Sequence, residues 1–81
     1  MILKYPVRTE KSIRMLELEN MITFVVDSRA NKQEIQKELE KEFKVKVIGV
    51  RTLMKGNKKT AYIRLAKENV AADIATKLGM M

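Results

Sequence analysis

The pattern of apolar and polar residues divides the mostly apolar residues 21–27 into two alternating faces. Ile22, Phe24 and Val26 fall on one face, and Met21, Thr23 and Val25 fall on the other. The segment is also rich in β-branched and aromatic residues, which favour strands. A period of two with this composition predicts a β-strand.

Three other segments repeat their apolar residues every three or four positions, and this spacing predicts helices. Thr9 is the expected N-cap of the first, a short helix that ends near residue 17. Asn31 caps the second, and Glu34 three residues later completes a capping box. Asn69 is the expected cap of the third. The apolar stripes are Ile13 with Leu16, then Ile35, Leu39 and Phe43, and finally Val70, Ile74 and Leu78, with Gly79 ending the last helix.

The segment after the second helix predicts a β-hairpin with arms of roughly residues 46–54 and 58–66. A Lys-Gly-Asn sequence at residues 55–57 makes the turn, because Gly and Asn both tolerate a positive φ. Alternation is regular in the second arm, whereas in the first arm it changes parity at Gly49. A change of parity at a glycine predicts a β-bulge or a bend.

A further short strand is predicted at residues 2–5 and ends at Pro6. The complete order is then strand, helix, strand, helix, strand, strand, helix. This order favours an α+β fold, with a mostly antiparallel sheet of about four strands and helices packed mainly on one face. The other face would present Thr60, Tyr62, Arg64 and the hairpin lysines. No repeat or linker interrupts the chain, so residues 1–81 are expected to form a single domain.

The chain contains neither histidine nor cysteine. Their absence removes the commonest general base, the commonest metal ligand and the thiolate nucleophile. Acidic pairs such as Glu38 with Glu42, and Glu40 with Asp73, lie on predicted helix surfaces, where solvated charge is the simplest interpretation. The sequence therefore predicts that the protein is not an enzyme, and it indicates no cofactor, no metal and no small-molecule substrate.

No run of about 18 apolar residues is present, and the first six residues are not followed by an apolar stretch of signal-peptide kind. A cytoplasmic protein without a membrane span is expected. The formal net charge is +7, and residues 43–67 hold eight Lys and Arg without one Asp or Glu. Chance clustering on a solvated surface is one interpretation. An acid-free block in an otherwise mixed chain instead favours a surface that binds a polyanion.

RNA is the polyanion that the residue types favour. Lys and Arg spaced along a hairpin can contact successive phosphates. Tyr62 either stacks on an unpaired base or is a strand residue half covered by its neighbours. Aromatic residues make up only 5% of the chain, which favours recognition of folded RNA by shape and backbone. The candidate RNA-binding residues are Arg8, Lys11, Lys46, Arg51, Thr52, Lys55, Lys58, Lys59, Tyr62 and Arg64.

Five short motifs, in this order and at this spacing, resemble a known family. They are Thr9-Glu10-Lys11-Ser12 after Pro6, Ala30-Asn31-Lys32 with Glu34-Ile35, Phe43-Lys44-Val45-Lys46-Val47, Val50-Arg51-Thr52-Leu53, and Ala61-Tyr62-Ile63-Arg64-Leu65. Together they cover nearly the whole chain. The sequence resembles the family of large-subunit ribosomal protein twenty-three, the universal protein beside the polypeptide exit tunnel.

The resemblance implies a cytoplasmic, ribosome-bound protein that contacts large-subunit ribosomal RNA and neighbouring ribosomal proteins. It also implies a docking role at the tunnel exit for the signal recognition particle or a ribosome-bound chaperone. Glu10 matches the acidic position that takes part in docking within the family. The simpler interpretation of Glu10 is a carboxylate that favours the dipole of a helix N-terminus.

Two positions depart from the family pattern. Arg51 stands where Asn is common, which leaves a phosphate contact plausible and an amide contact in doubt. Thr60 stands where a second basic residue is usual, so the RNA contacts of the hairpin would be shifted by one position. Residues 54–58 form only a tight turn in place of the long loop of bacterial members, which resembles the archaeal form.

Two other functions remain open from the sequence alone. A free-standing RNA-binding module would use several aromatic residues on its central strands, and only Tyr62 is suitably placed. A regulatory domain that binds a metabolite would need an apolar pocket with converging polar groups, which the acid-free hairpin does not suggest.

Overall fold

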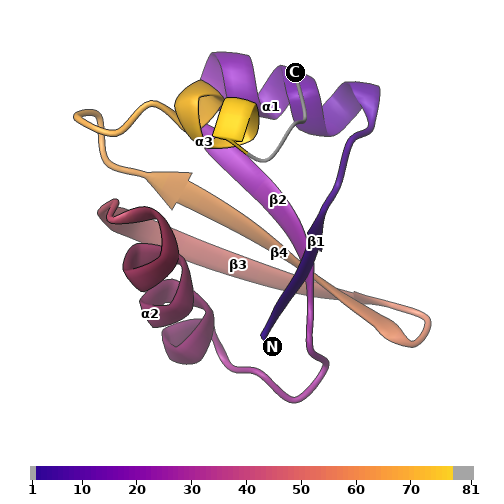
Figure 1. The fold of residues 1–81 in the computed structure, drawn as a ribbon. Coiled ribbons are helices and arrows are strands. Elements are labelled where there is room, and N and C mark those ends of the chain that lie inside the picture. The colour runs from indigo at the N-terminus through magenta and orange to yellow at the C-terminus, as the bar shows by residue number, and fades with distance from the viewer. Residues whose placement is uncertain (1, 78–81) are drawn as a thin grey trace.

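The computed structural model describes residues 2–77, which form a four-stranded antiparallel sheet and three helices (Figure 1). The strand order is β1-β2-β4-β3, so β2 and β4 form a central pair between β1 and β3. The α+β prediction is confirmed. The elements are β1 (Leu3–Pro6), α1 (Glu10–Glu19), β2 (Met21–Val26), α2 (Lys32–Phe43), β3 (Val47–Lys55), β4 (Lys58–Leu65) and α3 (Ala71–Lys77).

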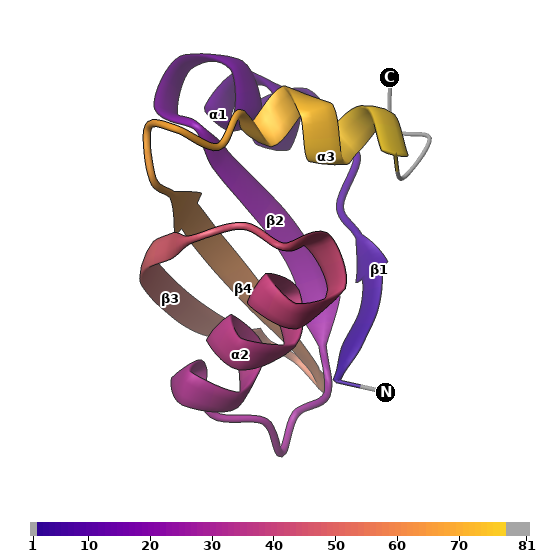
Figure 2. The ribbon, with the colours of Figure 1, turned by 60° about the vertical axis from the view of Figure 1, so that its left-hand side comes forward.

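The helices and the sheet enclose one apolar core. Figure 2 shows α2 lying across one face of the sheet, with α1 and α3 side by side at one end. Ile22 of β2, Ile63 of β4, and Ile35 and Leu39 of α2 are completely buried between these layers. Burial of each such side chain stabilises the fold by about 1.5–3 kcal/mol. The expected apolar faces of β2, β4 and α2 therefore do form the core.

Strand β2 is buried on both of its faces. Thr23 and Val25, on the face opposite Ile22, Phe24 and Val26, are 3% and 7% exposed. β2 is a central strand, hydrogen-bonded to β1 on one side and to β4 on the other. Neighbouring side chains on both flanks therefore shield even the residues that point away from α2.

The N-termini of α1 and α2 are capped by the predicted residues. The Thr9 hydroxyl accepts from the Ser12 N–H at 3.1 Å, and the Ser12 hydroxyl accepts from the Thr9 N–H at 2.9 Å. Asn31 and Glu34 form the corresponding pair at α2, with distances of 2.8 and 3.0 Å. Ser12, which is buried and closes the first box, was not predicted from the sequence. Helix α1 also continues two residues beyond the expected end, to Glu19.

The predicted start of the third helix is wrong. Helix α3 begins at Ala71, and its first N–H donates to Oδ1 of Asn20 at 2.7 Å. Asn69 instead accepts the backbone N–H of Lys46 at 2.7 Å. Val70, which was expected in the buried stripe, is 52% exposed because it precedes the helix. The expected positions Leu78 and Gly79 lie outside the described residues.

Asn20 joins three elements at this end of the fold. It ends α1 in the left-handed conformation, with φ of 55°. Its Nδ2 lies within hydrogen-bonding distance of the carbonyls of Leu65, Ala66 and Asn69, at 3.3, 3.2 and 2.8 Å. Its side chain therefore connects the end of α1 to the end of β4 and the start of α3.

The hairpin between β3 and β4 has the predicted turn and the predicted irregularity. Gly56 has a φ of +62°, whereas Asn57 does not have a positive φ, as in a two-residue turn with Gly first. The register of β3 shifts between Val47 and Gly49, which confirms the bulge. Within residues 2–77, no helix is long and apolar enough to cross a membrane.

Candidate nucleic-acid interface

The face of the sheet turned away from α2 is called here the open face. It is defined by the residues that alternate with the core positions of β3 and β4. Arg51 lies opposite Tyr62, Gly49 opposite Arg64, and Lys55 opposite Lys58. The register therefore places two arginines, two lysines and one tyrosine on a single side of two neighbouring strands. The predicted grouping of Tyr62 and Arg64 with hairpin lysines is confirmed for Lys55 and Lys58. The prediction that Thr60 is presented there is wrong, because Thr60 lies on this side but is only 7% exposed.

An open groove of about 900 Å³ lies between α1 and this part of the sheet. Lys11, Met15 and Glu19, spaced four residues apart on α1, line one wall. The sheet supplies the remaining lining residues, which combine apolar and basic side chains: Met21, Ile48, Gly49, Val50, Arg51, Thr52, Leu53, Tyr62 and Arg64. The groove can therefore accept a partner that has both an apolar ring or chain and a negative charge.

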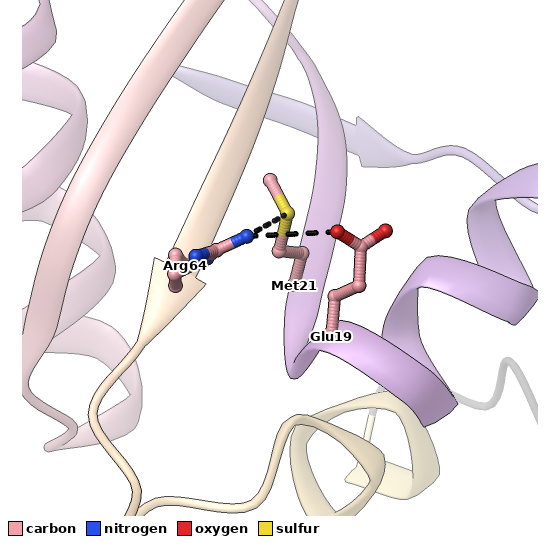
Figure 3. Close-up of polar contacts among 3 residues, drawn as sticks. All are labelled: Glu19, Met21 and Arg64. Atoms are coloured by element: carbon pink, nitrogen blue, oxygen red, sulfur yellow. Dashed lines mark hydrogen bonds and ion pairs between the residues drawn. The ribbon is translucent and has the colours of Figure 1, made fainter.

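Arg64 is held at the edge of the groove by residues from two other elements. Its Nη2 lies 3.6 Å from Oε1 of Glu19 and 3.6 Å from Sδ of Met21. Figure 3 shows the three side chains converging from β4, the end of α1 and the start of β2. The Arg64 and Glu19 side chains are 50% and 51% exposed, so water screens their attraction. The contact orients Arg64 without withdrawing its guanidinium from solvent.

The hairpin end of the open face carries a second aromatic residue that was not predicted from the sequence. Tyr5 of β1 is 45% exposed, and Nζ of Lys58 lies 5.9 Å from the centre of its ring. Tyr5 reaches this face because β1 pairs with β2, where Tyr5 lies opposite Val25. Only that strand pairing reveals its position, since residues 2–5 are too few to define a face by alternation.

Lys59 is not part of the open face. It lies opposite Val26 and Met54 in the register, on the side that α2 covers. Its Nζ donates to the carbonyl oxygen of Ala30 at 2.7 Å. Lys59 therefore has a hydrogen-bond partner within the protein, and its contact with RNA stays a prediction. Lys59 and the buried Ala61 are two residues apart in β4 and so lie on the same side of the strand, which could have revealed this position from the sequence.

The remaining candidate residues lie at different places on the surface. Thr52 lines the groove although it lies opposite buried Ala61 in the register. Arg8 is exposed between β1 and α1, and Lys46 is exposed just before β3. Neither lines the groove. Glu10 is exposed at the first position of α1.

Besides Glu34, two acidic side chains outside the groove have structural partners. Oε2 of Glu40, a residue predicted to be merely solvated, accepts the backbone N–H of Val47 at 3.0 Å and so ties α2 to the start of β3. Oδ1 of Asp27 accepts the N–H of Arg29 at 2.9 Å, and this hydrogen bond lowers the pKa of Asp27 below its usual value. Among residues 2–77, no group of three or more Asp or Glu side chains is placed to hold a metal ion.

Comparison with known proteins identifies the family. A family model described as "Ribosomal protein L23" matches residues 1–75. The "Large ribosomal subunit protein uL23" of Trypanosoma brucei brucei is 44% identical over 81 residues, which are 99% of this chain and 49% of the relative. The protein of the same name from Caldivirga maquilingensis is 52% identical over 77 residues, which are 93% of this chain and 88% of the relative.

The extent of these matches decides what they establish. The chain spans about half the length of the trypanosome relative and most of the Caldivirga relative. The family match covers every described element up to the last helix, including α1, the hairpin and the groove between them. The chain therefore belongs to the ribosomal protein L23 family.

Proposed function

We propose that the protein is a structural constituent of the large ribosomal subunit that binds large-subunit ribosomal RNA through its open face. The observation that carries this proposal is the separation of charge across the sheet. Lys11, Arg51, Lys55, Lys58 and Arg64 lie on the open face or in its groove. Helix α2, on the opposite face, carries four Glu and three Lys, so its formal net charge is −1. The open face is thus the more basic side of the domain and the better suited to a polyanion.

The chemistry of these side chains suits an RNA backbone. Each ammonium or guanidinium group that neutralises a phosphate releases a counterion, which favours binding at low salt. Arg51 and Arg64 also present planar groups that can hydrogen-bond two phosphate oxygens or stack on a base. Tyr62, half-buried between them, contributes an apolar surface to the groove. This combination favours recognition of folded RNA by its backbone with few direct base contacts.

Membership of the L23 family supports the wider role. The matched relatives are named as proteins of the large ribosomal subunit, and the family consists of ribosomal structural proteins. The protein is accordingly ribosome-bound in the cytoplasm, and it is not an enzyme. A core that extends from Leu3 of β1 to Ala75 of α3 supports one domain over residues 1–81. An archaeal origin stays a prediction, because a trypanosome relative also matches.

The position at the exit tunnel and the docking of factors belong to the same proposal. Glu10 is exposed at the N-terminus of α1 and does not line the groove. Its carboxylate is thus free to meet a protein while the open face contacts RNA. The proposed partners are neighbouring ribosomal proteins and the signal recognition particle or a chaperone at the tunnel exit. Glu10→Ala is expected to leave RNA binding unchanged and to weaken factor docking on assembled subunits.

A salt titration with two adjacent lysine variants tests the RNA-binding face. Lys58→Ala removes an exposed charge from the open face. Lys59→Ala removes the same charge from the face that α2 covers, called here the covered face. For a large-subunit ribosomal RNA fragment, Lys58→Ala should reduce the slope of log K against log salt by about 0.7–0.9, the value for one lost phosphate contact. Lys59→Ala should leave that slope unchanged, provided that thermal denaturation shows it folded.

An unrelated folded RNA of equal length serves as the control ligand. Binding of the ribosomal fragment should persist at salt concentrations that abolish binding of the control. Equal binding of the two RNAs would instead indicate a generic RNA-binding module outside the ribosome. Equal slopes for the two lysine variants would show that the open face is not the binding surface.

A further inference from the structure

We propose that the groove beside α1 receives a single unpaired guanine of the bound RNA and that the carboxylate of Glu19 reads it. This inference rests on the proposed RNA-binding function and names the nucleotide that the groove would select. Among the described residues that line the groove, Glu19 is the only acidic one. A negative charge at this place opposes the binding of phosphates, so a plain electrostatic role in RNA binding does not explain it.

The shape of the groove suits one inserted base better than a double helix. It is a hollow between α1 and the sheet, and its apolar lining includes Met15, Met21 and Leu53. A Cβ atom added at Gly49 would meet no atom of a more distant residue within 4 Å, so the space above the bulge is open. An A-form helix presents a convex surface of backbone and would rest on the rim of such a hollow. An unpaired base is flat and apolar on its faces, and proteins commonly take such bases into apolar or aromatic sites.

The Glu19 carboxylate lies beside Arg64 and still has acceptor capacity. Only its Oε1 contacts Arg64, at 3.6 Å, and the side chain is 51% exposed. Oε2 and the second lone pair of Oε1 are therefore available to a ligand. An ionised carboxylate accepts hydrogen bonds and donates none. The best ligand is consequently one that offers two adjacent N–H donors.

Guanine is the RNA base that meets this requirement. Its Watson–Crick edge carries the N1–H and the N2 amino group side by side, at the spacing of two carboxylate oxygens. Adenine and cytosine place an acceptor nitrogen beside their amino group, which a carboxylate repels. Uracil offers one N–H between two carbonyl oxygens. The edges of unpaired bases are the usual targets of sequence-specific RNA recognition.

Basic residues at the groove are placed for the phosphates that flank the inserted base. Lys11 lies on the α1 wall and Arg51 on the β3 side, and both are exposed. Arg64 has a double role, because it orients Glu19 and still exposes half of its side chain. A nucleotide in the groove would thus meet an apolar floor, one carboxylate and cations on both sides.

The test uses pentanucleotides of uridine with guanine, inosine, adenine, cytosine or uracil at the centre, bound to the full chain. The RNA with guanine should bind about tenfold more tightly than those with adenine, cytosine or uracil, which is within the discrimination of one bidentate contact. Inosine lacks the N2 amino group and should lose part of this preference. Glu19→Gln should abolish the preference, including the part that inosine keeps, without weakening the RNAs with adenine, cytosine or uracil, because a glutamine amide donates where N1–H also donates.

Glu17→Gln is the matched control, because Glu17 is exposed on the same helix but does not line the groove. It should keep the preference for guanine. Gly49→Leu fills the open space without straining a positive-φ residue, since Gly49 has none. It should reduce guanine binding several-fold and leave the thermal unfolding temperature nearly unchanged.

Equal binding of all five pentanucleotides, or a preference for guanine that survives Glu19→Gln, would overturn the inference. The ribosomal RNA fragment separates this result from failure of the proposed function. If the wild-type chain binds that fragment in preference to the control RNA but selects no base, only the guanine site is wrong. If it does not distinguish the fragment from the control RNA, the ribosomal RNA-binding function fails as well.

Discussion

Two neighbouring lysines show how differently the two faces of the sheet use the same side chain. Lys59 lies on the face that α2 covers, and its ammonium group donates to the carbonyl of Ala30 at 2.7 Å. Lys58, the preceding residue, is exposed on the open face, 5.9 Å from the ring centre of Tyr5. On the covered face the lysine has a fixed backbone partner. On the open face it remains available to a ligand.

The same difference holds for the larger residues of β4. Ile63 is completely buried in the core, whereas its neighbour Tyr62 is half-buried and lines the groove. One side of the strand thus contributes mainly packing energy, and the other contributes mainly a surface. Changes at the buried residues of the covered face should therefore mainly alter stability, while changes at the exposed residues of the open face should mainly alter binding.

The largest expected effect comes from this pair. Ile63→Ala should lower the free energy of unfolding by about 3–4 kcal/mol, because it leaves a cavity in the core. Tyr62→Ala should cost clearly less, since part of its ring already faces solvent, but it should weaken RNA binding. Urea denaturation measures the first quantity and titration with the ribosomal RNA fragment measures the second.

Ile63→Val keeps the test decisive if the alanine variant does not fold. It removes one methyl group and should cost about 1 kcal/mol. A larger loss of stability from Tyr62→Ala than from Ile63→Ala would contradict the division of roles between the faces.

The local signals in the sequence predicted much of this arrangement. The Asn31–Glu34 capping box, the glycine turn and the bulge near Gly49 each depend on residues close together in the chain. The alternation of Ala61, Ile63 and Leu65 also assigned the buried side of β4. Lys59 is two residues before Ala61, so the same alternation places Lys59 on the buried side of β4. The register of the hairpin was thus predictable, and only its consequence for Lys59 was missed.

Contacts between distant segments could not be predicted in this way. Tyr5 reaches the open face through the pairing of β1 with β2. Asn20 forms hydrogen bonds with residues more than forty positions later in the chain, of which Leu65 is the first in sequence. No local pattern marks either residue. The predicted cap Asn69 failed for the same reason, because the N–H of Ala71 is satisfied by Asn20 from another element. The RNA contacts of the candidate residues stay predictions.

Asn20 lies at the end of α1 and should give the second-largest change in the free energy of unfolding. Asn20→Ala removes hydrogen bonds to α3 and the end of β4 and places a residue with a Cβ but no polar group at φ of 55°. The loss should be about 2–3 kcal/mol, from unsatisfied backbone groups and the left-handed conformation.

Asn20→Gly separates these two causes. Glycine adopts the left-handed conformation without strain but makes none of the side-chain hydrogen bonds. It should therefore be more stable than Asn20→Ala by about 1 kcal/mol while remaining less stable than the wild type. A wild-type unfolding temperature for either variant would show that the hydrogen bonds of Asn20 contribute little.

The smallest effect should have the opposite sign, and it concerns the centre of the open face. Thr23 is 3% exposed, and its Oγ1 is buried without a hydrogen-bond partner. Its backbone carbonyl still accepts the N–H of Val7 at 2.9 Å, a contact that a substitution preserves. A buried hydroxyl without a partner costs about 1–3 kcal/mol relative to one in water. Thr23→Val, which keeps the shape and the strand preference, should therefore raise the free energy of unfolding by about 1 kcal/mol.

Thr52→Val is a suitable control for this prediction, because Thr52 lies on the neighbouring part of the sheet and is only half-buried. It should change stability little in either direction. Thr23→Val should also leave RNA binding unchanged, since Thr23 does not line the groove. If Thr23→Val instead destabilises the protein, the Thr23 hydroxyl has a hydrogen-bond partner such as a bound water. The buried polar groups at the centre of the open face would then be as completely hydrogen-bonded as those of the covered face.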